Sequence, residues 1–371
     1  MTAYDPPLRD DLRGEVPYGA PQLDVPVRLN VNENPYPPSA GLVADIAAAV
    51  ADAAARLNRY PDREATRLRA DLANYLKSFE GVDVEPARVW AANGSNEVMH
   101  QLLLAFGGPG RTVLGFAPTY SMYPQYCRDT FTGYLTVDRR PDFSLDVDVA
   151  IQAVREHRPV VTLLTSPNNP TGTALPLSAA TAIVAVAAEH GGLVVVDEAY
   201  AEFRRPGTTS ALQLLDDHPN LVVTRTMSKA FAYAGARVGY LVADAAVVDA
   251  VRIVRLPYHL SAVTQAVASA ALARAGELLA QVATLREERD ATVAWLRGAG
   301  FEVADSDANF VLFGRFADRH AVWQGLLDRG VLIRESGPPP WLRVSIGTAA
   351  EMATFRSALL EVTKRRVEVD V

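Results

Sequence analysis

The chain has little cysteine, no excess of positive charge and no long apolar run. Cys127 is the only cysteine among 371 residues, so an intramolecular disulfide is excluded and a reducing compartment is favoured. A formal net charge of −7 argues against nucleic acid as the main partner. No apolar run approaches the roughly 18 residues needed to span a bilayer, and the first residues contain no apolar signal core. We therefore expect a soluble, cytoplasmic protein with no nucleic-acid and no membrane partner.

Metal and serine-hydrolase chemistry also lack support. The six histidines show no ligand spacing, and no nucleophile elbow is present, so we expect no metal. What remains is a globular composition, 49% hydrophobic and 21% charged. A length of 371 residues suggests two domains, or one large domain with a smaller partner.

The order of apolar runs predicts three segments. Residues 1–41 are rich in proline and show little periodicity, which indicates an N-terminal arm. Between residues 88 and 240, short apolar runs alternate with helical patterns, which is typical of a mainly parallel α/β sheet. We thus expect a large domain over residues 42–258 and a smaller α+β domain with a linking helix over 259–371. The five runs are Val89–Ala92, Thr112–Phe116, Val160–Thr165, Leu193–Val196 and Leu221–Thr224.

Several boundaries outside these runs can also be predicted. Ser39 can cap an alanine-rich helix of about residues 42–57, and Asp62 can cap the helix after it. In the last third, a long helical pattern from about residue 278 ends near Gly298. The strands expected after it are 301–304, 309–313, 331–334 and 341–346, with a helix ending near residue 329 and a last one from residue 349.

Unusual residues follow each of the five runs at once. The segments are NGSNE after residue 92, APTY after 116, SPNNPTG after 165, DEAY after 196 and the lysine segment TRTMSKAFAYAGAR at 224–237. Ligands bind beyond the carboxyl ends of strands in open α/β sheets. We therefore expect these five ends to face one site.

Lys229 is the chemical centre of the lysine segment. It follows a buried strand, where loss of hydration lowers a lysine pKa and makes the amine a nucleophile able to form a Schiff base. Thr226, Ser228 and Arg237, eight residues beyond the lysine, offer two hydroxyls and a guanidinium that suit a phosphate monoester. A ligand that carries both an aldehyde and a phosphate would suit the lysine and this anion-binding group together. For these residues alone, a surface lysine in a loop is the alternative.

The other strand ends add partners for an aromatic ring. Asp197 closes a buried run, and its carboxylate needs a cationic partner such as a protonated pyridine nitrogen. Tyr200 and Asn169 can donate to a phenolate oxygen on that ring, and Tyr120 can stack on its face. The helix start at Ser95 and Asn96 offers backbone amides to a phosphate. Singly these signals are weak, since an aspartate after a strand is more often a helix cap, but their order is hard to obtain by chance.

At this point the sequence resembles the fold type I pyridoxal phosphate enzymes, specifically the class I/II aminotransferases, over nearly its whole length. Within them it is most similar to the histidinol-phosphate aminotransferases of the actinobacterial type. The motifs that carry the resemblance are LNVNENPYPP (29–38), NRYPD (58–62), WAANGSNE (90–97), FAPTYSMYP (116–124), SPNNPTG (166–172), VVDEAYAEF (195–203), TRTMSKAFAYAGARVGYL (224–241), RLPYHLSAVTQ (255–265), DANFVLFG (307–314) and WLRVSIGT (341–348).

The resemblance implies a fold, a cofactor and a set of roles. The fold is a large domain with a mostly parallel seven-stranded sheet flanked by helices, a smaller α+β domain and an N-terminal arm. The cofactor is pyridoxal 5'-phosphate, with Lys229 as the catalytic residue that binds its aldehyde and moves the proton. The residues implied to bind the cofactor are Ser95, Asn96, Tyr120, Asn169, Asp197, Tyr200, Thr226, Ser228, Lys229 and Arg237.

The resemblance also implies a homodimer with composite sites and two small-molecule substrates. Tyr60 is similar to the tyrosine that reaches the cofactor phosphate of the neighbouring subunit; packing beside Pro61 is its alternative. Arg343 and Arg334 match arginines that receive the carboxylate of glutamate and the phosphate of histidinol phosphate in turn. Tyr18 and Asn32 are assigned to substrate binding as well, although turn formation explains the amide-rich segment around Asn32 equally.

The implied activity is a ping-pong transamination between L-histidinol phosphate with 2-oxoglutarate and imidazole-acetol phosphate with L-glutamate, in histidine biosynthesis. One position departs from the pattern, because many relatives outside the actinobacterial type have an acidic residue where Asn96 stands. A backbone contact to the phosphate survives that change. An aromatic amino-acid aminotransferase or a phosphothreonine-type decarboxylase on the same scaffold is the nearest alternative. A non-catalytic binding module is the alternative from another class.

Overall fold

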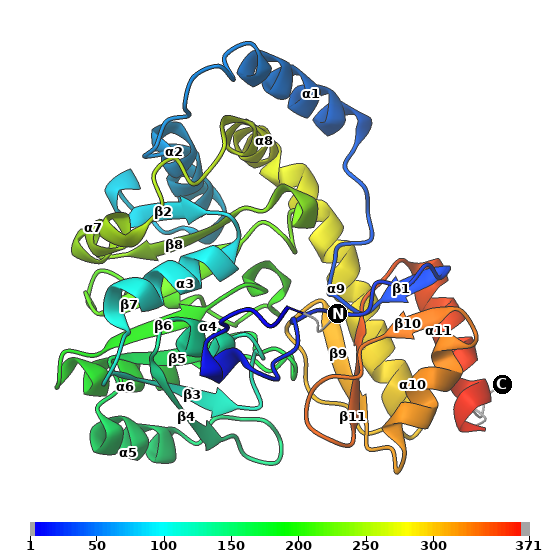
Figure 1. Ribbon diagram of the computed structural model, residues 1–371. Helices are drawn as coiled ribbons and strands as arrows, with labels where there is room; N and C mark the ends of the chain where they lie inside the picture. Colours follow the sequence, from blue (N-terminus) through cyan, green and yellow to red (C-terminus); the bar gives the residue numbers. More distant parts are fainter. Residues whose placement is uncertain (1–3, 365–371) are drawn as a thin grey trace.

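The computed structural model describes residues 4–364 of the chain. A seven-stranded sheet with helices on both faces forms one body, and the long helix α9 (Ala275–Gly298) runs from it to a second, smaller body (Figure 1). Across residues 4–364, no helix is long and apolar enough to cross a membrane.

The sheet has the strand order β2-β8-β7-β6-β5-β3-β4. All neighbours pair in parallel except β8, which is antiparallel to both β2 and β7. The predicted mostly parallel, seven-stranded sheet is therefore confirmed. Its strands are β2 (Val89–Ala92), β3 (Thr112–Ala117), β4 (Gly133–Asp138), β5 (Val161–Thr165), β6 (Leu193–Asp197), β7 (Leu221–Thr226) and β8 (Gly239–Ala243).

Side chains alternate between two cores along each strand, because successive residues of a strand point to opposite faces. In β6, Val194 and Val196 pack into one hydrophobic cluster and Val195 into the other. The helices that cover the face of Val195 are α3 (Ser95–Phe106), α4 (Tyr123–Asp129) and α7 (Ala245–Val254). The helices on the opposite side are α1 (Ala40–Ala54), α2 (Thr66–Tyr75), α5 (Val147–His157), α6 (Leu177–Ala188) and α8 (Ala262–Ala273).

The second body is built on two short pairs of strands. β9 (Phe310–Gly314) and β11 (Trp341–Ser345) are antiparallel, and β1 (Val27–Leu29) pairs in parallel with β10 (Val331–Ile333). The N-terminal segment thus contributes a strand to this body, beside α10 (Arg319–Leu327) and α11 (Ala349–Thr363) (Figure 1). A bridge between Arg334 and Arg343 joins the two pairs.

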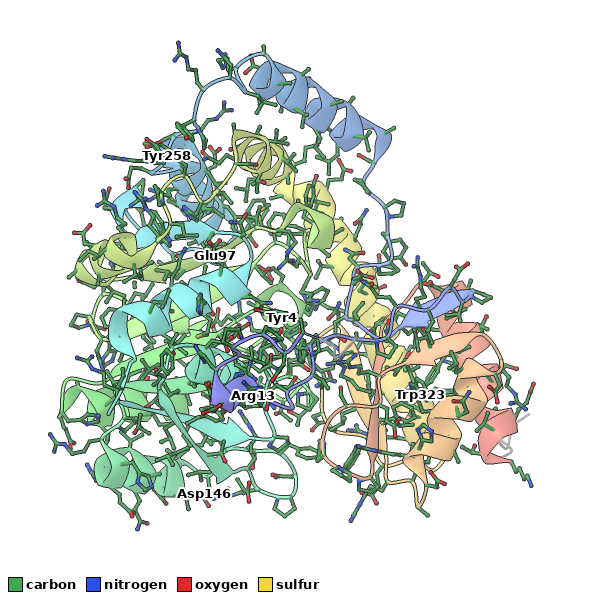
Figure 2. All side chains as sticks on the ribbon, viewed as in Figure 1. Tyr4, Arg13, Glu97, Asp146, Tyr258 and Trp323 are labelled. Atoms are coloured by element: carbon green, nitrogen blue, oxygen red, sulfur yellow. The ribbon has the colours of Figure 1, made fainter. Side chains whose placement is uncertain are left out.

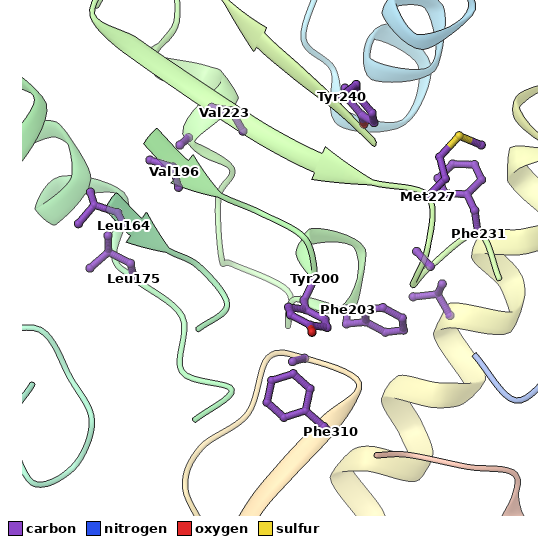
Figure 3. Close-up of a cluster of buried hydrophobic side chains, with 14 of the residues drawn as sticks. Leu164, Leu175, Val196, Tyr200, Phe203, Val223, Met227, Phe231, Tyr240 and Phe310 are labelled. Carbon is purple, nitrogen blue, oxygen red and sulfur yellow. The ribbon is translucent and has the colours of Figure 1, made fainter. Parts of the chain in front are cut away.

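The two bodies share one continuous core near the strand ends. Tyr200, just after β6, meets Phe310 of β9 edge to face at 5.0 Å between ring centres (Figure 3). Both belong to the same hydrophobic cluster as Val196 and Val223 of the sheet. The second body is therefore packed directly against the carboxyl ends of the parallel strands.

Most predicted boundaries agree with the structure, and two predictions are wrong. Ser39 does cap α1, accepting a hydrogen bond from Leu42 N. Asp62 is not the cap of α2, because Ala65 occupies that position in the left-handed conformation while Asp62 accepts from Thr66 N at 2.8 Å. The strand expected at residues 301–304 is reduced to one bridge at Val303. Phe301 N instead donates a hydrogen bond to Leu296 O at the end of α9.

The division into segments 1–41, 42–258 and 259–371 stays a prediction. α8 packs on α1 and α2, so it lies with the sheet body although it follows residue 258. Residues 1–3 and 365–371 of the outer segments lie outside the described residues. Short 3-10 helices are η1 (Asp10–Leu12), η3 (Pro86–Arg88), η4 (Ala201–Phe203), η5 (Ala211–Leu214) and η6 (Ala234–Ala236), and η2 (Leu76–Glu80) is a π-helix that continues α2.

Candidate active site

A cavity of about 530 Å³ lies where the strand ends of the sheet meet the second body. Residues that follow β2, β3, β5, β6 and β7 line it, so the five strand ends do face one site, as predicted. The predicted site residues that line it are Tyr18, Asn32, Ser95, Asn96, Tyr120, Asn169, Asp197, Tyr200, Thr226, Ser228, Lys229, Arg237, Arg334 and Arg343.

Lys229 lies three residues beyond β7, every residue of which is buried. Its Nζ donates a hydrogen bond to Val31 O at 2.9 Å, which aims the amine into the cavity wall formed by the N-terminal segment. Burial, with repulsion from Arg343, lowers the pKa of Lys229 to about 8. About a tenth of the amine is then neutral at pH 7, as a nucleophile requires.

Asp197 is the last residue of β6 and is buried at the cavity wall. Tyr123 Oη donates to its Oδ2 at 2.8 Å, and Ala199 N donates to its Oδ1 at 3.1 Å. Burial raises the pKa of Asp197. Among residues 4–364, Asp197 forms no ion pair, so its buried carboxylate can pair with a cationic group in the cavity.

The opposite side of the cavity is built for an anion. α3 begins at Ser95, and the first amides of a helix have no intrahelical acceptor. Arg237, in the left-handed conformation at φ +55°, donates to Ser228 Oγ at 3.3 Å. Gly94 precedes the helix at φ +84°, and a Cβ there would lie 2.5 Å from Arg237 Nη2. The glycine therefore lets the guanidinium approach the helix start.

A hydrogen-bonded group joins the middle of the cavity to the second body. Asn32 Nδ2 donates to Tyr200 Oη at 3.0 Å, and Asn169 Nδ2 lies 3.5 Å from the same oxygen. Arg343 Nη1 donates to Asn169 Oδ1 at 2.5 Å, and its Nη2 to Asn30 O at 3.0 Å. Burial lowers the pKa of Arg343 to about 10, which leaves the guanidinium charged at neutral pH.

Arg334 lies beside Arg343, because the two backbones exchange hydrogen bonds of 3.0 and 3.1 Å. Within residues 4–364, Arg334 forms no ion pair. The guanidiniums of Arg334 and Arg343 therefore both face the cavity and can bind an incoming anion. Tyr18 also lines the cavity, and its hydroxyl accepts a hydrogen bond from Ser121 Oγ at 3.2 Å.

Tyr60 does not line the cavity of its own chain. Its ring is 78% exposed and stacks on Tyr258 at 4.3 Å between ring centres. Tyr258 lies on the sheet body beside α2, well away from Trp323 of the second body (Figure 2). A contact between Tyr60 and a cofactor thus requires a second subunit.

Sequence reasoning missed two contributors to the site. Val31 acts through its backbone carbonyl, which no side-chain pattern reveals. Tyr123 is three residues from Tyr120 within the motif FAPTYSMYP, but only the fold shows that its hydroxyl, and not that of Tyr120, contacts Asp197.

The residues that line the cavity fit pyridoxal phosphate. A buried carboxylate without a protein cation suits the ring nitrogen, an arginine beside a helix start suits the phosphate, and a lysine of lowered pKa suits the aldehyde. Gly94 has no side chain, and the space that this leaves beside Arg237 belongs to the region that suits the phosphate.

Known proteins similar to this chain are aminotransferases. The family model of aminotransferase class I and II matches residues 25–359. The chain is 66% identical over 361 residues to a histidinol-phosphate aminotransferase of Thermobifida fusca, covering 97% of this chain and 96% of that protein. It is 63% identical to histidinol-phosphate aminotransferase 3 of Burkholderia lata, with 96% of each chain covered. The solved structure of histidinol-phosphate aminotransferase from Sinorhizobium meliloti, in complex with pyridoxal-5'-phosphate, is similar with a TM-score of 0.82 at 26% identity, covering 92% of this chain and 91% of that one.

Proposed function

We propose that this chain, which belongs to the class I and II aminotransferases, is a pyridoxal phosphate-dependent histidinol-phosphate aminotransferase. It interconverts L-histidinol phosphate and 2-oxoglutarate with imidazole-acetol phosphate and L-glutamate, a step of histidine biosynthesis. The observation that carries the proposal is one cavity that joins the buried Lys229, the unpaired carboxylate of Asp197 and the two guanidiniums of Arg334 and Arg343.

Each side chain has one task in this mechanism. When bound, pyridoxal phosphate supplies an electron-accepting ring that stabilises negative charge on the substrate carbon. Lys229 would bind the cofactor aldehyde through its Nζ, and the same amine, once released, would move the proton, which its lowered pKa permits. Asp197 would keep the ring nitrogen protonated, and Tyr200 and Asn169 would bind the ring oxygen. Tyr120 would provide an aromatic face for the ring.

The phosphate of the cofactor is assigned to the start of α3 and the segment after β7. Arg237 supplies the charge, and the other ligands are Ser95, Asn96, Thr226 and Ser228. The hydroxyls of Thr226 and Ser228 are already held in place: Thr226 Oγ1 accepts from Ser228 N at 3.1 Å and donates to Val238 O at 3.2 Å, and Ser228 Oγ accepts from Arg237 Nη1 at 3.3 Å. Little conformational freedom is therefore lost when the phosphate binds.

The substrate side must accept two different anions. Histidinol phosphate has a phosphate and no carboxylate, whereas glutamate has two carboxylates. A planar guanidinium binds either group through two parallel hydrogen bonds, so Arg334 and Arg343 can serve both half-reactions. Tyr18 and Asn32 complete the pocket from the N-terminal segment.

A comparison of amino donors tests this specificity. With 2-oxoglutarate as acceptor, kcat/KM for histidinol phosphate should exceed that for phenylalanine by at least about 100-fold, since a phosphate paired to two arginines contributes several kcal/mol that a phenyl ring does not. Equal values for the two donors, or a preference for phenylalanine, would favour the aromatic aminotransferase instead.

We also assign Tyr60 to the cofactor phosphate of a partner subunit in a homodimer. Its exposure and the nearby exposed Ile253 and Leu256 support an apolar contact surface at this place. Mixing inactive Lys229→Ala subunits with Tyr60→Ala subunits tests the assignment. Hybrid dimers gain one intact site if Tyr60 acts in the partner, so activity should rise above the sum of the two variants. Absence of any gain in verified hybrids would show that Tyr60 does not act across subunits.

A cytoplasmic location and a domain division complete the proposal. The buried thiol of Cys127 is consistent with a reducing compartment. Residues 42–258 are proposed as the large cofactor-binding domain, 1–41 as an N-terminal arm that contributes to the small domain and the active site, and 259–371 as the smaller domain with its linking helix, a division that limited proteolysis would test.

A further inference from the structure

Tyr123 has a buried hydroxyl that the mechanism above does not use. It is the first residue of α4, followed by Pro124, and its side chain is almost wholly buried. Its Oη lies 2.8 Å from Asp197 Oδ2 and 2.9 Å from Thr165 Oγ1. Thr165 Oγ1 in turn lies 3.2 Å from Thr119 Oγ1. Four polar side chains thus form one chain of hydrogen bonds.

The bond to Asp197 fixes the direction of this chain. Tyr123 Oη donates to Asp197 Oδ2, and a tyrosine hydroxyl has only one hydrogen to give. Tyr123 Oη must then accept from Thr165, and Thr165 Oγ1 from Thr119. Thr119, Thr165 and Asp197 line the cavity, whereas the Tyr123 hydroxyl lies behind its wall. Every hydroxyl therefore points its hydrogen toward the carboxylate.

The ring of Tyr123 has a second neighbour in the cavity. It meets the ring of Tyr120 edge to face, at 5.6 Å between centres and 90° between planes. This geometry is favourable for aromatic pairs and holds the face of Tyr120 at a defined angle. One buried side chain thus contacts both the carboxylate and the aromatic ring assigned to the two sides of the cofactor.

We propose that Tyr123 is a positioning residue that holds the Asp197 carboxylate in its charged form toward the cavity and fixes the Tyr120 ring beside it. The inference rests on the proposed function only in identifying what Asp197 faces. Without the Tyr123 hydroxyl, Asp197 Oδ2 loses the hydrogen-bond donor that lies 2.8 Å from it, and a buried carboxylate short of a donor is costly.

The test is a double-substitution cycle read by pyridoxal phosphate binding to the full-length apoprotein. Tyr123→Phe keeps the ring and removes only the hydroxyl. The association constant should fall by about 10- to 100-fold, as expected for loss of a hydrogen bond to a charged group. In the Asp197→Ala background, the same substitution should change the constant by less than about threefold, because its target is gone.

Tyr134→Phe is the matched control. Tyr134 is partly buried and packs against the hydrophobic cluster that contains Tyr123, and its buried hydroxyl has no hydrogen-bond partner among residues 4–364. This substitution should change the association constant by less than about twofold. A steady-state comparison adds a second readout: Tyr123→Phe should lower kcat more than it alters KM for glutamate, since neither Asp197 nor Tyr120 is assigned to the substrate anion.

Thermal unfolding of the apoproteins keeps the test independent of cofactor uptake. Tyr123→Phe should lower Tm by about 2 °C or more in the native background and by clearly less in the Asp197→Ala background. Equal penalties in the two backgrounds, in binding and in Tm, would reduce Tyr123 to a packing role and overturn the proposal. A wild-type protein that binds no pyridoxal phosphate would refute the proposed function, while the Tm cycle would still measure the coupling of Tyr123 and Asp197.

Discussion

Replacing Gly94 by alanine should separate cofactor binding from folding. Gly94 precedes α3 at φ +84°, a conformation that costs an alanine about 1 kcal/mol. The added Cβ would lie 2.5 Å from Arg237 Nη2. Because this atom is the end of a flexible side chain, the guanidinium can swing away, and stability should fall by little more than the backbone strain.

Binding should suffer far more than stability. Moving the guanidinium withdraws a charge-assisted hydrogen bond from the phosphate, worth about 1.5–3 kcal/mol, or roughly 10- to 100-fold in the cofactor dissociation constant. Titration of the apoprotein with pyridoxal phosphate measures the loss. Gly191→Ala is the control, because Gly191 has a similar φ of +76° and nothing within 4 Å of its added Cβ. Wild-type affinity in Gly94→Ala, or an equal loss in Gly191→Ala, would refute the assignment of this cradle to the phosphate.

Three further predictions follow from the buried charges. The rate at which the apoprotein takes up pyridoxal phosphate should rise about tenfold per pH unit below pH 8 and level off above it. The reason is that the neutral amine of Lys229, with its pKa of about 8, is the reacting form. A rate independent of pH between about 6 and 9 would contradict this. Arg343→Lys should raise KM for glutamate and for histidinol phosphate by about 100-fold, since a lysine cannot hold Asn169, the Asn30 carbonyl and an anion at once, whereas steady-state constants within about twofold of wild type would argue against it. Arg225→Leu should cost about 3–5 kcal/mol in urea unfolding, because this wholly buried arginine binds Glu80, Glu198 and Glu202; replacing the exposed Arg56, paired with Asp52, should have little effect.

The strand ends could be predicted from sequence because buried parallel strands have a clear pattern. Runs such as Leu193–Val196 are apolar throughout, and this one is followed at once by Asp197 and Glu198. β4 was not predicted, since it lies at the edge of the sheet and its residues are partly or fully exposed. β8 is wholly buried but follows the lysine segment directly, where the chemistry of the motif hides the start of a strand.

The sequence predicts many of the residues that line the cavity but few of the contacts between them. Motif order brought Lys229, Asp197 and Arg237 together, because strand ends of a parallel sheet converge whatever the details of the loops. The hydrogen bond of Asn32 to Tyr200 joins residues 168 positions apart, and Tyr123 reaches Asp197 across 74 positions. Such pairings depend on how the N-terminal segment and α4 pack on the sheet, which local patterns do not specify.

The most direct test of the central claim is a half-reaction with histidinol phosphate alone. Wild-type protein loaded with pyridoxal phosphate should lose its visible absorbance stoichiometrically as histidinol phosphate is added, and should recover it when 2-oxoglutarate follows. The Lys229→Ala protein should show no such cycle at the wild-type rate. Unchanged absorbance of the loaded wild-type protein at saturating histidinol phosphate, with a full response to another amino donor, would contradict the account.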